Sequence, residues 1–171
     1  MFMDEMRFGL ISNYRRSWSR VGKRTVIANQ QEFINRYLYS AIDPITGDNF
    51  HLLGFNDVNA AITKKFLEAL IEEYSEYHIL LVWDNAPFHR KKELHQMTGL
   101  TPMFLPSYSP ELNPVERFYG EIRKSTANRL FKDIQIQEEI IENEVIKWMN
   151  NTEKTQKLCG YPWIIEQSKS I

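Results

Sequence analysis

The sequence predicts an α/β protein in which a mixed β-sheet is flanked by helices. Three observations carry this prediction. The first 55 residues are rich in β-forming side chains, the apolar period becomes helical from Asn59 onward, and strands and helices then alternate. In sheets of this kind, ligands bind beyond the carboxyl ends of the strands. The sequence therefore also indicates where a site is to be sought.

Two antiparallel units are expected in the first part of the chain. Residues 1–10 and 17–24 are predicted as strands around a turn. Residues 36–55 are predicted as a hairpin, because the segment DPITGD supplies turn residues between two β-rich runs.

The next elements alternate between helix and strand. Residues 59–74 predict a helix with Asn59 as its cap, and its apolar stripe comprises Ile62, Phe66, Ala69, Leu70 and Tyr74. Residues 78–84 are apolar without alternation, which predicts a strand buried on both faces in the parallel part of a sheet.

The rest of the chain predicts a short helix over 91–97, a strand over 101–106, a longer helix over 113–131 and a last helix over 134–150. The longer helix carries an apolar stripe made of Val115, Phe118, Tyr119 and Ile122. The residues expected to be buried in the last helix are Ile136, Ile140, Val145 and Trp148.

Composition fits one globular domain over residues 1–171, with 43% apolar and 25% charged residues and a net charge of −1. A single cysteine, Cys159, excludes an internal disulfide framework and a cysteine-rich zinc site, and it is expected to pack as a small apolar residue. The longest uninterrupted apolar run, 79–83, is too short for a membrane span. A soluble, cytoplasmic protein is expected.

Basic residues are concentrated near the N-terminus. Residues 7–24 contain no acid, surround Trp18, and carry Arg7, Arg15, Arg16, Arg20, Lys23 and Arg24. This segment could follow a phosphate backbone with the indole as a stacking face, or it could be a solvated basic hairpin. Both interpretations stay open at this point.

Asp84 ends the apolar run in LVWDNAPFHR. Carboxylates rarely lie against buried chain unless they are paired or bind a metal. Asp84 is predicted where a buried strand ends and a site opens. The alternative is that Asp84 and Asn85 only form the turn.

Glu116 lies in a second informative stretch, FLPSYSPELNPVERFYGEIRK. Asn113 resembles an N-cap, Pro114 suits the first helical position, and Glu116 completes a capping box. On the helix, Glu116 lies about 100° from Val115, at the edge of the apolar stripe. From there it could also share a metal with Asp84.

Asp4 is the third candidate, and Glu5 and Asp43 are alternatives to it. Strand alternation allows only one of Asp4 and Glu5 to point at the site. Three oxygen ligands without a cysteine cluster favour Mg²⁺ or Mn²⁺ over Zn²⁺. Two such ions, about 4 Å apart, would support phosphodiester cleavage.

The combination of LVWDNAPFHR with FLPSYSPELNPVERFYGEIRK resembles the DDE transposases of the mariner superfamily, especially their bacterial insertion-sequence branch. The resemblance includes MDE at the start and YSAIDPITGD, so it covers nearly the whole chain. It implies a ribonuclease-H-like fold and a site on Asp4, Asp84 and Glu116 that binds two Mg²⁺ ions, for which Mn²⁺ can substitute. It also implies that a water cuts the transposon end and that the released 3′ hydroxyl attacks target DNA.

The resemblance further implies that DNA is the partner, as transposon ends and target, and that a homodimer brings paired ends together. Arg15, Arg16, Arg20, Lys23 and Arg24 are the residues expected to contact DNA. Asn85 is a candidate accessory residue, and His89 is either packed, capping or catalytic.

One departure from the family is expected: only three residues precede Asp4, so we expect the upstream helix-turn-helix region that binds transposon ends to be missing from this chain. We therefore expect a catalytic-domain fragment or one product of a split reading frame. Two alternatives to a transposase are a host nuclease of the same fold and a catalytically inactive remnant that binds DNA.

Overall fold

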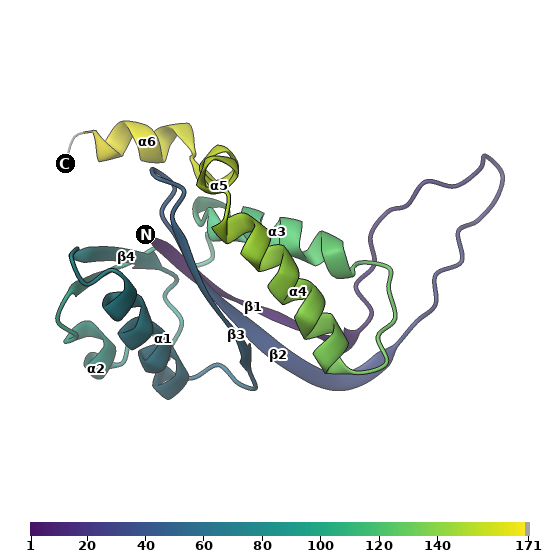
Figure 1. The fold of residues 1–171 in the computed structure, drawn as a ribbon, viewed down its shortest axis with the longest axis horizontal. Coiled ribbons are helices and arrows are strands. Elements are labelled where there is room, and N and C mark those ends of the chain that lie inside the picture. Colours follow the sequence, from purple (N-terminus) through teal and green to yellow (C-terminus); the bar gives the residue numbers. More distant parts are fainter. Residues whose placement is uncertain (170–171) are drawn as a thin grey trace.

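The computed structural model describes residues 1–169 and contains a five-stranded sheet in the order β3-β2-β1-β4-β5 (Figure 1). The strands are β1 (Phe2–Ile11), β2 (Gln31–Ile42), β3 (Asn49–Phe55), β4 (Ile79–Trp83) and β5 (Leu100–Phe104). β1, β2 and β3 pair in antiparallel fashion, whereas β4 runs parallel to β1 and to β5. The predicted mixed sheet of an α/β protein is confirmed.

Helices cover both faces of this sheet, and each face has its own apolar core. They are α1 (Ala60–Glu73), α2 (Lys92–His95), α3 (Val115–Thr126), α4 (Ile134–Met149), α5 (Thr152–Cys159) and α6 (Pro162–Ser168). Alternate residues of β1 serve the two cores: Phe2 and Met6 pack with α3 and α4, and Met3 packs with α1. The β1 strand is therefore the element around which both layers are built.

The hairpin, α1 and β4 lie where the sequence predicts them. Asn59 caps α1 by accepting a 3.0 Å hydrogen bond from the Ile62 amide, and Phe66 and Leu70 are buried. In β4, Leu80 is 38% exposed while the other four residues are buried. Burial on both faces is thus correct for most of this strand, and Leu80 is the exception.

The strand predicted over 17–24 is wrong, because residues 12–30 form a long loop that projects beyond the sheet (Figure 1). Its base is closed by two hydrogen bonds, from the Ser12 amide to the Gln30 carbonyl at 3.0 Å and from the Gln30 amide to the Ser12 hydroxyl at 2.7 Å. Trp18 and Val21 are fully exposed. The alternating side chains of this segment have no layer to pack against, so no strand ladder forms.

Two further differences concern the C-terminal third. The helix predicted over 113–131 ends at Thr126, because Ala127 is extended and Asn128 adopts a left-handed conformation with φ 58°. Ile136, predicted to be buried, is 40% exposed, whereas Gln137 on the same helix is buried.

The segment 134–150 is not the last helix, since α5 and α6 follow it. Cys159 at the end of α5 is fully buried, as expected. Among residues 1–169, no helix combines the length and the apolarity that a membrane span requires.

Candidate active site

A cavity of about 450 Å³ lies beyond the carboxyl end of β4, and Asp4, Asp84 and Glu116 all line it. The ladder between β1 and β4 consists of the single pair Phe2 and Val82, so the two strands no longer pair where the acids lie. The loop 105–110 after β5 and the start of α3 complete the wall. The structure therefore brings the three candidate acids from distant parts of the chain to one opening beyond the end of β4.

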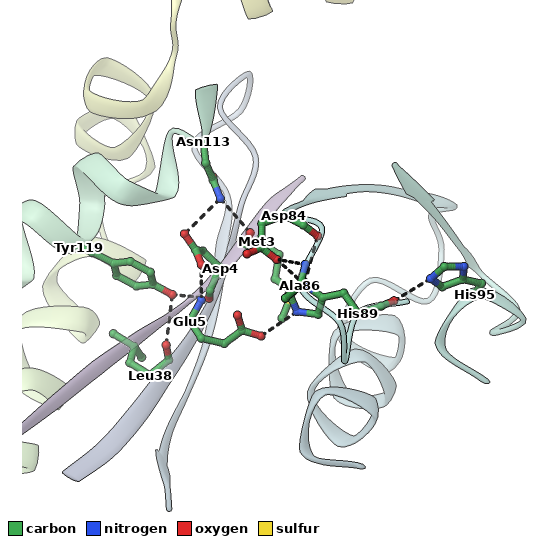
Figure 2. Close-up of polar contacts among 10 residues, drawn as sticks. All are labelled: Met3, Asp4, Glu5, Leu38, Asp84, Ala86, His89, His95, Asn113 and Tyr119. Atoms are coloured by element: carbon green, nitrogen blue, oxygen red, sulfur yellow. Dashed lines mark hydrogen bonds and ion pairs between the residues drawn. The ribbon is translucent and has the colours of Figure 1, made fainter. Parts of the chain in front are cut away.

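Asp4 is held by two side chains from the α3 region (Figure 2). The Tyr119 hydroxyl donates to the main-chain carbonyl of Asp4. The Asn113 side-chain amide donates to the Met3 carbonyl at 3.0 Å and to the Asp4 carboxylate at 3.3 Å. These contacts fix the carboxylate of Asp4 at the cavity wall.

Burial, together with the nearby carboxylates of Glu5, Glu116 and Asp84, raises the pKa of Asp4 to about 8. A carboxylate in such surroundings is stabilised by a proton or by a cation. The local field of this cavity therefore favours the binding of a positive charge.

Asp84 both forms a turn and lines the cavity, so the two interpretations from the sequence are compatible. Its carboxylate accepts hydrogen bonds from the Ala86 amide at 3.1 Å and from Nδ1 of His89 at 2.6 Å. The hydrogen bond from His89 lowers the pKa of Asp84 below its ordinary value. Asp84 is thus held as a carboxylate facing the opening.

His89 is a packed side chain that lies behind the cavity wall. It is 1% exposed and stacks on Trp83, with ring centroids 4.4 Å apart. Its Nε2 lies 3.1 Å from a carboxylate oxygen of Glu5 (Figure 2), and Glu5 does not line the cavity. Burial lowers the pKa of His89, but the hydrogen bonds to Asp84 and Glu5 dominate together and raise it to about 9. His89 lies between two carboxylates, and its raised pKa favours the imidazolium form.

Glu116 is not used in the helix cap. Asn113 does cap α3, because its side-chain oxygen accepts from the Val115 amide at 3.1 Å. The main-chain N–H of Asn113, however, donates to the Pro110 carbonyl at 3.0 Å and not to the Glu116 side chain. The capping box is therefore only half formed. The Glu116 carboxylate instead lies 3.6 Å from Nη1 of Arg123 and lines the cavity.

Two other residues at this end of the sheet are informative, and so is Asp43 at the opposite end. Asn85 lines the cavity and accepts a 2.7 Å hydrogen bond from Nε of Arg90. Tyr108, in the loop after β5, is fully exposed with φ 59°, a strained conformation for an aromatic residue. Asp43 lies in the β2–β3 turn, where its carboxylate accepts from the Ile45 amide, and it does not line this cavity.

The acids fit a hard divalent cation by their chemistry. Within residues 1–169, no three His, Cys, Asp or Glu side chains lie close enough together to hold a metal on their own. Mg²⁺ usually keeps several waters and takes ligands from substrate phosphates in addition to one or two carboxylates. Asp4, Asp84 and Glu116 around an open cavity meet that requirement.

Sequence comparison assigns the chain to a family. The sequence model of the DDE superfamily endonucleases matches residues 1–137. The chain belongs to this family.

Known proteins similar to this chain include an uncharacterized protein, y4pE/y4sA, of Sinorhizobium fredii (strain NBRC 101917 / NGR234), which is 36% identical over 89 residues. That match covers 52% of this chain and 58% of the relative. The Mos1 transposase in a paired-end complex with the left transposon end is similar in structure, with a TM-score of 0.61 and 18% identity over 93% of this chain and 55% of that chain. The chain thus spans little more than half the length of these two proteins.

The catalytic domain of the Mos1 mariner transposase gives a TM-score of 0.59 with 13% identity over 93% of this chain and 79% of that chain. The ribonuclease-H-like fold expected from the sequence is confirmed. Its place in the bacterial insertion-sequence branch stays a prediction.

The basic loop, residues 12–30, has a fixed part and an exposed part. Nη2 of Arg15 donates to the Gly120 carbonyl at 2.8 Å, and Arg15 also bonds Asn128 through its main chain. Arg15 is therefore tied to α3 and the segment that follows it. The other predicted DNA-contacting residues are exposed: Arg16, Arg20, Lys23 and Arg24.

Proposed function

We propose that this chain is the catalytic domain of a transposase, which cleaves DNA at transposon ends and transfers the cleaved strand into target DNA. The observation that carries the proposal is that Asp4, Asp84 and Glu116 line one cavity at the strand ends of a chain in the DDE superfamily. The similarity to Mos1 transposase bound to a transposon end supports the same class of substrate.

Asp4, Asp84 and Glu116 would hold two Mg²⁺ ions, for which Mn²⁺ can substitute. Structures of the Mos1 paired-end complex with Mn and with Mg support this choice of metal. When bound, such ions activate an attacking oxygen and stabilise the leaving oxygen of a phosphodiester. The chain's own residues set the geometry: Asn113 and Tyr119 position Asp4, and His89 positions Asp84.

The proposal is tested by comparing two glutamates of the same helix. In a plasmid-nicking assay with Mn²⁺, Glu116→Gln is expected to lower the cleavage rate about 100- to 1000-fold, because it removes one of the charges that would hold the metal. The control is Glu121→Gln, since Glu121 lies on α3 outside the cavity and pairs with Lys124. Equal rates for the two variants would contradict the proposal.

A host nuclease of the same fold is distinguished from a transposase by its products. With pre-cleaved oligonucleotide ends and a target plasmid, a transposase joins the 3′ end to the plasmid, whereas a plain nuclease yields only hydrolysis products. We further propose that two copies of the chain act together, because two transposon ends have to be paired.

The exposed part of the basic loop is proposed to contact the DNA backbone. The double variant Arg20→Ala/Arg24→Ala is expected to lower the slope of log affinity against log salt by about 2, because each phosphate contact contributes about 0.9. Binding is measured by fluorescence anisotropy on a duplex at several salt concentrations. Lys64→Ala/Lys65→Ala removes the same charge from the exposed side of α1 and is expected to leave the slope unchanged. Equal slopes for both double variants would mean that the loop is only solvated.

A further inference from the structure

The two strands that lead to Asp4 and Asp84 separate where these acids lie. Among the described residues, β1 and β4 form a single ladder pair, Phe2 with Val82. If this parallel register continued for two more residues, Asp4 would lie beside Asp84. The Asp84 side chain is 57% exposed, and main-chain pairing with β1 does not fix its position. The separation of the two carboxylates therefore depends on contacts between side chains.

A buried series of side chains connects β1 with the turn at Asp84 (Figure 2). Nε2 of His89 lies 3.1 Å from Oε1 of Glu5, and Nδ1 of His89 lies 2.6 Å from Oδ1 of Asp84. The side chain of His89 is 1% exposed and that of Glu5 is 8% exposed. Buried polar networks whose members are paired are rigid, unlike exposed ion pairs. These two contacts thus join β1 to Asp84 where the ladder has ended.

Glu5 restricts the one movement that the packing of His89 leaves open. The imidazole stacks on Trp83, with ring centroids 4.4 Å apart and ring planes inclined by 12°. Stacking fixes the plane of the ring, but the ring can still slide or rotate within that plane. Hydrogen bonds at its two nitrogens prevent this movement. The reach of Glu5 therefore determines where His89 meets the Asp84 carboxylate.

The β1 strand acts on the site from both of its faces. Asp4 lies on the same face as Phe2 and Met6, which pack with α3 and α4, and it lines the cavity. Glu5 lies on the opposite face, where its pairing partner Tyr39 belongs to the core under α1. The two adjacent acids of β1 are thus both connected to the site, Asp4 directly and Glu5 through His89.

We propose that Glu5 is a positioning residue of the active site, which through His89 sets the position of the Asp84 carboxylate relative to that of Asp4. The inference rests on the proposed function, because this separation matters for the metal ions that the two carboxylates would hold. Side chains that hydrogen-bond to metal ligands from behind orient those ligands, and their loss typically lowers metal affinity about 10- to 100-fold.

Two substitutions of Glu5 separate its reach from its charge. Glu5→Gln keeps the length of the side chain, and its amide can hydrogen-bond to Nε2 of His89 as a donor or as an acceptor. Glu5→Asp keeps the charge beside His89 but is shorter by about 1.5 Å, the length of one carbon–carbon bond. The control is Glu93→Asp, which shortens an exposed glutamate of α2 that does not line the cavity.

The first measurement needs no metal and follows the order of the turn at Asp84. The Ala86 amide donates to the Asp84 carboxylate at 3.1 Å, so its ¹⁵N relaxation reports on that turn. Its order parameter is expected to be about 0.85 in the wild type, Glu5→Gln and Glu93→Asp, and below about 0.6 in Glu5→Asp. The second measurement is the calorimetric affinity for Mn²⁺, which Glu5→Asp is expected to weaken about tenfold and Glu5→Gln by less than about twofold.

Each result decides the role of Glu5. An Ala86 amide that is as ordered in Glu5→Asp as in the wild type would overturn the proposal. A disordered amide with unchanged Mn²⁺ affinity would also overturn it, because Glu5 would then serve the fold alone. Equal losses in Glu5→Gln and Glu5→Asp would overturn it by showing that His89 requires the charge of Glu5 and not its reach. A wild type that binds no Mn²⁺ would contradict the proposed function instead, and the order of the Ala86 amide would still test whether Glu5 positions Asp84.

Discussion

Replacing Asp84 with asparagine is expected to weaken Mn²⁺ binding about 100-fold in a calorimetric titration. Asp84 is the candidate ligand whose carboxylate is kept ionised by a neighbour, because the hydrogen bond from His89 lowers its pKa. The asparagine retains the acceptor for the Ala86 amide and for His89, so the turn and the fold are expected to persist. Loss of affinity would therefore report the charge and not the structure.

The matched control for this experiment is Asp57→Asn. Asp57 is exposed, lies before α1, and does not line the cavity. The Asp57→Asn variant is expected to bind Mn²⁺ as the wild type does. Far-ultraviolet circular dichroism would verify the fold of both variants. If Asp84→Asn bound Mn²⁺ as tightly as Asp57→Asn, Asp84 would not be a metal ligand.

The second large effect is a dependence of stability on pH that arises from His89. Its pKa is about 9 in the folded protein against an ordinary value of 6.5. Protonated His89 stabilises the folded protein fully below pH 6.5. This stabilisation is lost as the pH rises through 9, because His89 of the folded protein then releases its proton. The free energy of unfolding is expected to fall by about 3 kcal/mol over this window.

Urea unfolding at several pH values checks this prediction. The comparison is made in an Asp4→Asn background, because the raised pKa of Asp4, about 8, also makes stability fall as the pH rises. In that background, adding His89→Gln is expected to flatten the profile. Adding His78→Gln, at an exposed histidine, is expected to leave the profile unchanged. Parallel profiles for the two histidine variants would show that His89 does not carry an imidazolium.

Much of the fold follows from local sequence signals. The helical period after Asn59, the turn residues between β2 and β3, and the continuous apolar run of β4 each determine their element with little help from distant residues. The segment 17–24 misleads because alternation indicates a strand only if a layer lies beneath it, and the loop projects into solvent. The short helices α5 and α6 were missed because they are too brief to show a clear period.

The site is less accessible to sequence reasoning, because its supporting contacts join distant residues. Asp84 and Glu116 could be proposed from a strand end and a helix position, whereas only the family resemblance selected Asp4 over Glu5 and Asp43. The structure places all three acids on one cavity. The contact between His89 and Glu5 spans 84 positions, and that between Tyr119 and Asp4 spans 115. Nothing in the local pattern around Tyr119, which has the spacing of a core residue, reveals that its hydroxyl holds Asp4.

The arrangement of α3 determines where this chain can change in length. Asn113, Glu116, Tyr119 and Arg123 all act from α3 or its cap, so inserting one residue after Glu116 would turn the later side chains by about 100° relative to it. Either Glu116 or the packed stripe would then lose its partners. The loop 12–30 is different, because its ends are joined at Ser12 and Gln30 and its middle packs on nothing. Related chains are therefore expected to vary in length in that loop while keeping the interval from Asn113 to Arg123 constant.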